Sequence, residues 1–311
     1  MEKTRTGASC VVYSLSARAR RRRTRRYAIL HRVAYVVVAL YCLLRLCITT
    51  QRRLKKPSSL RVAILLYGVK RSSRLTEFSI KGKILDKLTE ANVSYVIFHH
   101  RITVSDIIAP SVQETLPVTE SGVQDVIIQE NFGYFSSILN HGDAWGRGNR
   151  TILNMLVALT SLKRAAILSQ KHAAAFDGLI VLRPDLLYLD ELDVNLLKHA
   201  IHRRFSIVVP SWMWYDGCND RFSYGEYGSM LKIAKRIDFA LKYCKRTGKP
   251  FHSENFMDWN IKKNKLHVFS THQRAIRVRE DGAVAAIDHA LLTPAEHNLL
   301  HTFASRTGIT I

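Results

Sequence analysis

The sequence FDGLIVLRPDLLYLDEL, residues 176–192, contains the strongest indication of the fold. In it an apolar run, Gly178–Leu182, is followed directly by Arg183, Pro184 and Asp185. A run of apolar residues without polar alternation is typical of a strand that is buried on both faces of a parallel sheet. Because ligands of open α/β sheets bind beyond the carboxyl ends of the strands, Asp185 is predicted to lie where a binding site forms.

The sequence around this run alternates between predicted strands and helices. The apolar run of residues 61–67, which ends at Gly68, predicts a second buried strand. Further strands are predicted at residues 94–99, 126–128 and 205–209, and helices at residues 77–91, 151–170 and 228–243. This alternation predicts an α/β domain built on βαβ units.

Charge is divided unevenly along the 311 residues. Residues 1–60 hold 15 Lys and Arg and a single acidic residue, whereas the rest of the chain holds 32 basic and 24 acidic residues. Most of the net charge of +22 therefore belongs to the N-terminal tail. An apolar content of 47% excludes a disordered protein and allows one well-cored domain of roughly 200–250 residues beside the tail.

An apolar segment, residues 28–48, follows an arginine-rich run and has the length to cross a bilayer core of roughly 30 Å. No cleavage pattern of small residues follows it, so the segment predicts an uncleaved signal anchor. Positive charge is retained on the cytoplasmic side, which predicts a single-pass type II membrane protein of the Golgi or ER with a luminal C-terminal body. An organelle-targeting transit peptide is the alternative, because residues 3–26 are rich in Arg and poor in acids.

The chain is thus predicted to consist of a basic cytoplasmic tail (1–27), the transmembrane signal anchor (28–48), a short stem (49–60), a main domain (61–282) and a C-terminal helical extension (283–311). Asn92 and Asn149 begin glycosylation sequons, which suit a luminal domain. Cys218 and Cys244 allow one disulfide there, and the cysteine spacing contains no zinc pattern.

Basic residues follow both of the strongest predicted strands. Gly68 opens a basic loop that contains Arg71, where a glycine lets the backbone approach a ligand and a guanidinium group suits a diphosphate. A solvated basic loop is the alternative. Arg183 is placed to bind a phosphate, or to form a structural ion pair with Asp185.

The segment that follows the strand at 205–209 is rich in aromatic and polar residues, among them Trp214, Asp216 and Asn219. Aromatic faces stack on sugars, and carboxylates and amides bind hydroxyl groups, although core packing explains the aromatics equally well. Further along, Glu254 is predicted near the N-terminus of a helix that Ser253 caps. Glu254 is therefore either a favourable charge at a helix end or an acid–base group.

Six motifs stand in order along the chain: LLYGVKR, LIVLRPDLLY, VVPSW, NDRFSYG with a following SM, HSENFMDWNIKKN and RVREDG. Together they resemble a family of GT-A-like glycosyltransferases and glycosyltransferase-like proteins found in polysaccharide-building systems and in algae and plants. The resemblance covers roughly residues 61–282. It implies a GT-A-like, Rossmann-type mixed sheet flanked by helices, and makes residues 61–282 the catalytic domain.

The resemblance implies that a sugar is moved from a nucleotide-sugar donor to an acceptor hydroxyl on a glycan, protein or lipid. By position it assigns donor binding to Gly68, Arg71, Arg183 and Asp185. It places Asp220 and Glu254 on the acceptor side, where one of these carboxylates would take the proton of the hydroxyl. Trp214, Asp216 and Asn219 are the residues expected to contact the acceptor sugar.

The resemblance also raises the question of a metal ion. GT-A enzymes usually hold a divalent cation with Asp-x-Asp, whereas this chain has Arg183-Pro184-Asp185. Asp185 is the remaining metal-binding candidate, with Mg²⁺ or Mn²⁺ as the expected ion of an oxygen site. The missing carboxylate leaves open an alternative function, a catalytically inactive, membrane-tethered protein that binds carbohydrate or nucleotide. No nucleic-acid partner is expected, although the basic charge allows attraction to polyanions.

Overall fold

The computed structural model describes residues 41, 60–69, 73–104, 116–144, 146, 148–172, 175–279 and 281–298. The predicted tail, anchor and stem therefore lie outside the described residues, apart from Tyr41 and Leu60. Arg71 and the last part of the predicted C-terminal extension also lie outside them.

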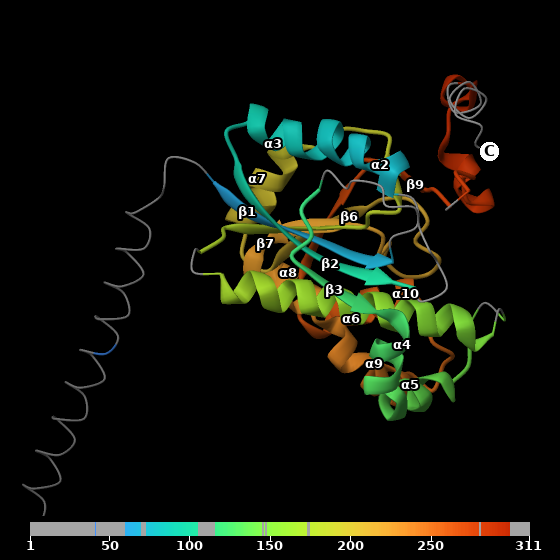
Figure 1. Ribbon diagram of the computed structural model, residues 1–311. Coiled ribbons are helices and arrows are strands. Elements are labelled where there is room, and N and C mark those ends of the chain that lie inside the picture. The colour runs from blue at the N-terminus through green and yellow to red at the C-terminus, as the bar shows by residue number, and fades with distance from the viewer. Residues whose placement is uncertain are drawn as a thin grey trace, which may run out of the picture. The chain divides into compact units, whose positions relative to one another are not determined.

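The described chain alternates strands and helices, as the sequence predicts (Figure 1). The strands are β1 (Arg61–Val69), β2 (Ser94–Thr103), β3 (Glu120–Val123), β4 (Gly178–Leu182), β5 (Leu186–Tyr188), β6 (Ser206–Pro210), β7 (Ser223–Glu226), β8 (His267–Thr271) and β9 (Ala275–Arg277). The α-helices are α2 (Ser73–Ile80), α3 (Asp86–Glu90), α4 (Gln124–Glu130), α5 (Phe132–Leu139), α6 (Asn149–Lys171), α7 (Val194–His202), α8 (Tyr227–Ala234), α9 (Ala240–Thr247) and α10 (Ser253–Lys263). A π-helical turn, η1 (Lys81–Leu85), joins α2 to α3, and 3₁₀ turns form at η2 (Arg236–Phe239) and η3 (Ala286–Leu291).

Seven strands form one sheet in the order β3-β2-β1-β4-β7-β6-β8. Every neighbouring pair in it is parallel except the two pairs that β7 makes with β4 and β6. Strands β5 and β9 pair antiparallel in a separate two-stranded sheet. The predicted fold class, a mixed α/β sheet flanked by helices, is confirmed, and its GT-A-like type stays a prediction.

Helices cover both faces of the sheet, with α2, α3 and α7 on one side and α6 and α8 on the other (Figure 1). Successive side chains of β1 point to alternate faces, so Leu66 packs in one core with α7, and Leu65 packs in the other with α6. Both leucines are fully buried. Burying such a side chain contributes about 1.5–3 kcal/mol, which explains the continuous apolar sequence of this strand.

Two predictions of secondary structure are wrong. Residues 126–128, predicted as a strand, belong to α4, in which Ile127 is buried and Val126 is 47% exposed. Ile127 and the partly buried Ile128 pack on the core while Val126 faces outward, which suits a helix that lies on a core. A β-branched run this short does not distinguish a strand from a helix. The predicted helix at 228–243 is broken into α8, η2 and α9, and the break turns Arg236 into the interior.

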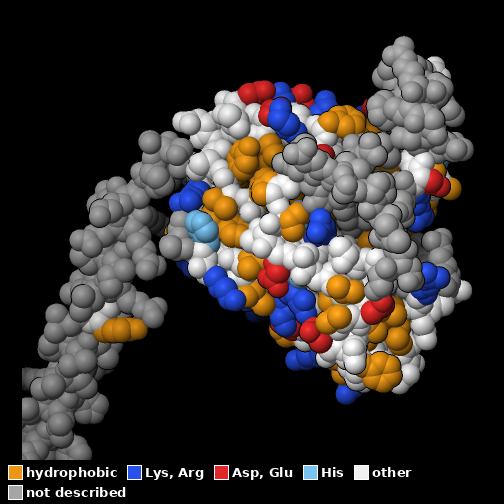
Figure 2. All heavy atoms as spheres, in the orientation of Figure 1, with side chains coloured by type: hydrophobic (Ala, Val, Ile, Leu, Met, Phe, Trp, Pro, Cys, Tyr) orange, Lys and Arg blue, Asp and Glu red, His pale blue; other side chains and the backbone are white. Residues whose placement is uncertain are grey.

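Helix α6 is, among the described residues, the one helix that is long and apolar enough to cross a membrane. Its residues Leu156 and Leu162 are fully buried in the core beneath the sheet, so packing accounts for its apolar composition. On the molecular face shown in Figure 2, basic side chains are interspersed with acidic and apolar ones.

Candidate functional site

A cavity of about 360 Å³ opens at the carboxyl ends of β1 and β4 and is called here the Glu254 cavity. Its lining brings together five predicted site residues from distant parts of the sequence: Gly68, Arg183, Asp185, Asp220 and Glu254. Strands β1 and β4 bring Gly68, Arg183 and Asp185 to one edge of the sheet, and the loop before β7 and the start of α10 add Asp220 and Glu254. This edge is where ligands of open α/β sheets bind. The cavity is therefore the candidate active site.

Arg183 and Asp185 form a bidentate ion pair at the end of β4. Nε of Arg183 donates to Oδ1 of Asp185 at 2.9 Å, and Nη2 donates to Oδ2 at 2.7 Å. Burial lowers the pKa of Arg183, but the charge and hydrogen bonds of Asp185 outweigh that effect and raise the pKa overall. The structural ion pair that the sequence left open is present, and it lies within the cavity.

This ion pair bears directly on the predicted metal site. Both oxygens of Asp185 already accept hydrogen bonds from a guanidinium group, which would repel a cation bound at the same carboxylate. Among the described residues, no group of three His, Cys, Asp or Glu side chains could hold a metal ion. The described residues therefore form no preassembled site for a divalent ion, and an Mg²⁺ or Mn²⁺ ion bound together with the donor stays a prediction.

Gly68 has a φ of +108°, which is strained for any other residue, and it is still paired with Arg101 of β2. Its amide does not face the cavity, because it donates to Oγ of Ser161 in α6 at 3.0 Å. The same hydroxyl donates to the carbonyl of His100 at 2.7 Å. Gly68 is thus tied to the helix beneath it, and its amide is already used within the fold.

Glu254 lies in the first turn of α10, with its side chain 14% exposed. Burial, and next the charge of Asp220, raise the pKa of Glu254 to about 7. A hydrogen bond from Oγ of Ser253 opposes this shift only in part. A carboxyl group with a pKa near neutrality can both accept and release a proton at physiological pH.

The helix cap beside Glu254 differs from the prediction. The N-cap of α10 is His252 rather than Ser253, and its Nδ1 accepts a hydrogen bond from the amide of Asn255 at 3.4 Å. Burial lowers the pKa of His252, so its ring is neutral at physiological pH. The 3.4 Å contact between this ring and Glu254 is therefore not an ion pair there.

Asp220 faces a buried cation. Its Oδ2 lies 3.7 Å from Nη2 of Arg236, whose side chain is 2% exposed. The interruption of the predicted helix at η2 is what brings Arg236 to this position. Arg236 compensates the charge of Asp220 and so allows a second carboxylate to lie close to Glu254.

The three residues predicted to contact an acceptor sugar do not line the cavity. Trp214 donates to the carbonyl of Pro210, Asp216 is exposed, and Asn219 is buried. Tyr215, from the same loop, does line the cavity. The acceptor roles of Trp214, Asp216 and Asn219 remain predictions.

The sequence reasoning missed a buried charge cluster beneath the cavity. Asp288, in η3, is fully buried and accepts from Nη2 of Arg221 at 2.8 Å and from Nε of Arg277 at 3.1 Å. Arg221, Arg277 and Arg279 all line the Glu254 cavity. The motifs NDRFSYG and RVREDG contained these arginines, but no local pattern marks Asp288 as their partner.

No protein-family model and no curated protein matches this chain. Among solved structures, the apo form of mouse xyloside xylosyltransferase 1 matches with a TM-score of 0.37 and 11% sequence identity. The match covers 68% of this chain and 85% of that chain. A likeness at this level carries no argument about function, for which the site itself is the support.

Proposed function

We propose that this chain is a glycosyltransferase that moves a sugar from a nucleotide-sugar donor to an acceptor hydroxyl. The observation that carries the proposal is the environment of Glu254, a buried carboxyl group with a pKa raised to about 7 by burial and by Asp220. It lies in an arginine-lined cavity at the carboxyl end of the sheet. Perturbed acids in such cavities are typical of proton-transfer chemistry.

The arginines supply the chemistry that a nucleoside diphosphate needs. Guanidinium groups bind phosphate oxygens in a bidentate way, and Arg183, Arg277 and Arg279 line the cavity. Arg279 is exposed and forms no ion pair with any described residue, so its charge is available to a ligand. The donor diphosphate is proposed to bind beside Arg183, Arg277 and Arg279.

In a direct displacement, the acceptor oxygen attacks the anomeric carbon of the donor and a new C–O bond forms. The bond between that carbon and the diphosphate oxygen breaks, and the nucleoside diphosphate leaves with the electron pair. Ionised Glu254 takes the proton of the acceptor hydroxyl. The arginines stabilise the negative charge that develops on the leaving group.

The test is donor turnover by the purified full-length chain, measured as release of nucleoside diphosphate over a panel of nucleotide sugars. We expect release from one donor and a loss of about 100-fold or more in Glu254→Gln. Glu90→Gln is the matched control, because its carboxylate is 61% exposed on α3 and lies outside the cavity lining. Equal turnover in the two variants would contradict the role of Glu254.

The second candidate is a tethered protein that binds carbohydrate or nucleotide without turnover. It is favoured by one observation, the occupation of both Asp185 oxygens by Arg183 at the predicted metal position. Saturable binding of a nucleotide sugar, with no product from any acceptor, would support it over a transferase.

The proposed setting is a type II membrane protein of the Golgi or ER. Asn92 and Asn149 are exposed on the described surface, as luminal glycosylation sites must be. A mobility shift on endoglycosidase treatment, lost in the Asn92→Gln/Asn149→Gln double variant, would support a luminal domain. Cleavage of the domain by protease in sealed microsomes would contradict it.

A further inference from the structure

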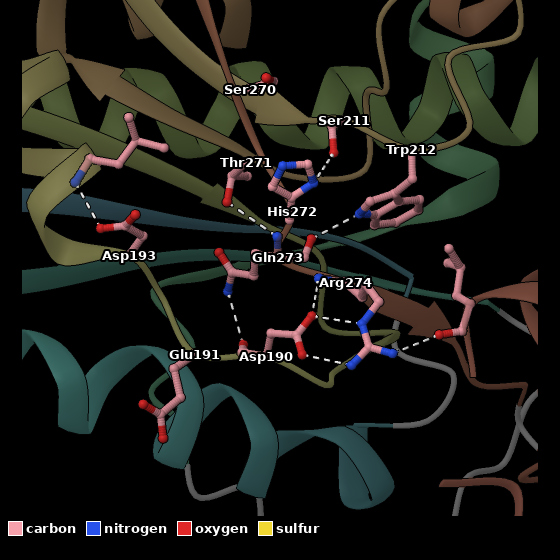
Figure 3. Close-up of a pocket in the computed structure, with 12 residues that line it drawn as sticks. Asp190, Glu191, Asp193, Ser211, Trp212, Ser270, Thr271, His272, Gln273 and Arg274 are labelled. Atoms are coloured by element: carbon pink, nitrogen blue, oxygen red, sulfur yellow. Dashed lines mark hydrogen bonds and ion pairs between the residues drawn. The ribbon is translucent and has the colours of Figure 1, made fainter. Parts of the chain in front are cut away.

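A second hollow lies at the carboxyl ends of β6 and β8 and is called here the Trp212 pocket (Figure 3). It has a volume of about 650 Å³ and is open to solvent. Figure 3 shows Trp212, Ser211 and His272 on one side of it and Asp190 with Arg274 below. Neither the predicted site residues nor the proposed chemistry uses these side chains.

The lining combines an aromatic ring with hydrogen-bonding groups. Half-buried Trp212 stands beside Oγ of Ser211, which is 3.1 Å from Nδ1 of the exposed His272. Gln273 is 4% exposed, and its Oε1 accepts no hydrogen bond from any described residue. A buried amide oxygen without a donor costs free energy unless a ligand or water satisfies it.

The charge of Arg274 in the pocket lining is compensated by carboxylates. Arg274 donates to both oxygens of Asp190 and is held again by Glu296 at 3.0 Å. Oδ1 of Asp193 accepts from the amide of Leu196 at the start of α7. The pocket therefore offers no uncompensated cation to a phosphate, and its polar groups suit uncharged hydroxyls.

The Trp212 pocket shares a wall with the Glu254 cavity. The guanidinium carbon of Arg221 lies 5.1 Å from the centre of the Trp212 ring. Arg221 lines the Glu254 cavity, and Trp212 lines the pocket. The linings of the two hollows are thus in contact through the Arg221–Trp212 pair.

We propose that the Trp212 pocket binds the neutral oligosaccharide arm of the acceptor, away from the hydroxyl that reacts. Sugar faces stack on the aromatic ring, and sugar hydroxyls pair with Gln273, Ser211 and His272. This inference rests on the proposed glycosyl transfer for the identity of the ligand as an acceptor. Binding of the glycan does not itself require turnover.

The test is binding of short neutral oligosaccharides to the purified full-length chain without donor, measured by ligand-detected NMR and calorimetry. We expect His272→Ala and Gln273→Ala each to weaken binding by about tenfold, while nucleoside diphosphate binding stays unchanged. His267→Ala, an exposed histidine at the opposite end of β8, is the matched control. Trp212→Phe keeps an aromatic ring but removes the hydrogen bond that the indole donates to the carbonyl of Gln273, so its unfolding midpoint is measured beside its glycan affinity.

Three results would overturn the proposal: no oligosaccharide binds, the control weakens binding as much as the pocket variants do, or a phosphorylated or polyamine ligand binds there instead. The proposed function fails separately. If glycan binding depends on His272 but the chain turns over no donor, the role of the pocket is supported and the proposed transferase activity is wrong. If the chain transfers sugar and the pocket variants leave the acceptor KM unchanged, the proposed transferase is supported and the proposed role of the pocket is wrong.

Discussion

A methyl group added to Gly217 would lie 2.2 Å from the carbonyl carbon of Glu254, so the loop before β7 and the start of α10 meet without room for a side chain. The amide of Cys218 also donates to the carbonyl of Glu254 at 3.0 Å. These contacts fix the backbone that carries the proposed base. Gly217 is therefore a positioning residue for Glu254.

Gly217→Ala is expected to displace Glu254 and to lower donor turnover by about tenfold or more, because misplacement of a catalytic group by about 1 Å has a large effect on rate. The backbone atoms of Glu254 cannot move aside as a flexible side chain can. The measurement is kcat beside the thermal unfolding midpoint.

The control for this variant is Gly133→Ala at an exposed position of α5, where an added Cβ meets nothing within 4 Å. That substitution should leave turnover unchanged and raise stability by about 0.5–1 kcal/mol. If both alanine variants keep full turnover, Gly217 does not position the base.

The raised pKa of Glu254 predicts two opposite pH effects. The folded pKa of about 7 exceeds the ordinary value of 4.5, so the stability that this group contributes is complete below pH 4.5 and is lost as pH rises through 7. Glu254→Gln should therefore be more stable than the parent by about 2–3 kcal/mol near pH 8.5, and equal to it near pH 4.

Turnover should follow the opposite direction, rising as pH passes about 7, because only the ionised carboxylate accepts a proton. Denaturant titrations and kcat/KM profiles over the same pH range measure the two effects. A stability difference that does not change with pH would show that Glu254 has an ordinary pKa.

Asp288→Asn should destabilise the fold by about 3–5 kcal/mol at neutral pH, since it removes the carboxylate shared by two arginines. Burial raises the pKa of Asp288, but the hydrogen bond from Arg277 and the charge of Arg221 lower it overall. Its stabilising effect is therefore lost only as pH falls through that lowered pKa.

The matched control is Asp238→Asn, which removes an ion pair with Lys163 between side chains that are 43% and 35% exposed. Such a surface pair contributes about 0–1 kcal/mol. Urea unfolding of both variants measures the difference. Equal losses would mean that the Asp288 cluster contributes no more than a surface pair.

Removal of metal ions should leave the protein itself unchanged. Because Asp185 is held by Arg183, treatment with EDTA is expected to shift the thermal unfolding midpoint by less than about 1 °C and to release no stoichiometric metal. Calorimetry and elemental analysis test this. A midpoint that falls on chelation and recovers with Mn²⁺ would reveal a divalent site.

Cys218 and Cys244 are buried free thiols, so the disulfide that the sequence allowed is not formed. Burial raises the pKa of each to about 11, with the charge of Asp258 acting second at Cys218. Both should resist alkylation near pH 8 in the native protein and react in urea. A peptide joining residues 218 and 244 in a non-reducing digest would disprove this.

The sequence correctly predicts those strands and helices whose apolar pattern lies within one continuous stretch of residues. The strand at 178–182 agrees with β4, and the helix predicted at 151–170 differs from α6 by two residues at the start and one at the end. The helix repeats its apolar pattern over enough residues to match one periodicity only, whereas the strand is marked by a short continuous apolar run that ends at a turn. The same patterns place Arg183 and Asp185 correctly at a strand end.

The remaining features depend on contacts between distant residues. The break at η2 accompanies the pairing of Arg236 with Asp220, and the pairing of Asp288 with Arg221 joins residues 67 apart. No local periodicity encodes such pairs. The sequence also cannot reveal that Asn219 supports its own loop, donating to the carbonyl of Trp212 and accepting from the amide of Arg221.

Asp288 also has a consequence for synthesis on the ribosome. It follows every strand of the sheet in the chain, so a nascent chain can pair its strands while Arg221 and Arg277 still lack their shared carboxylate. The positive charges of Arg221 and Arg277 then lack their shared carboxylate until η3 has been made. The order of translation thus completes the charge cluster beneath the Glu254 cavity only after every strand of the sheet has been made.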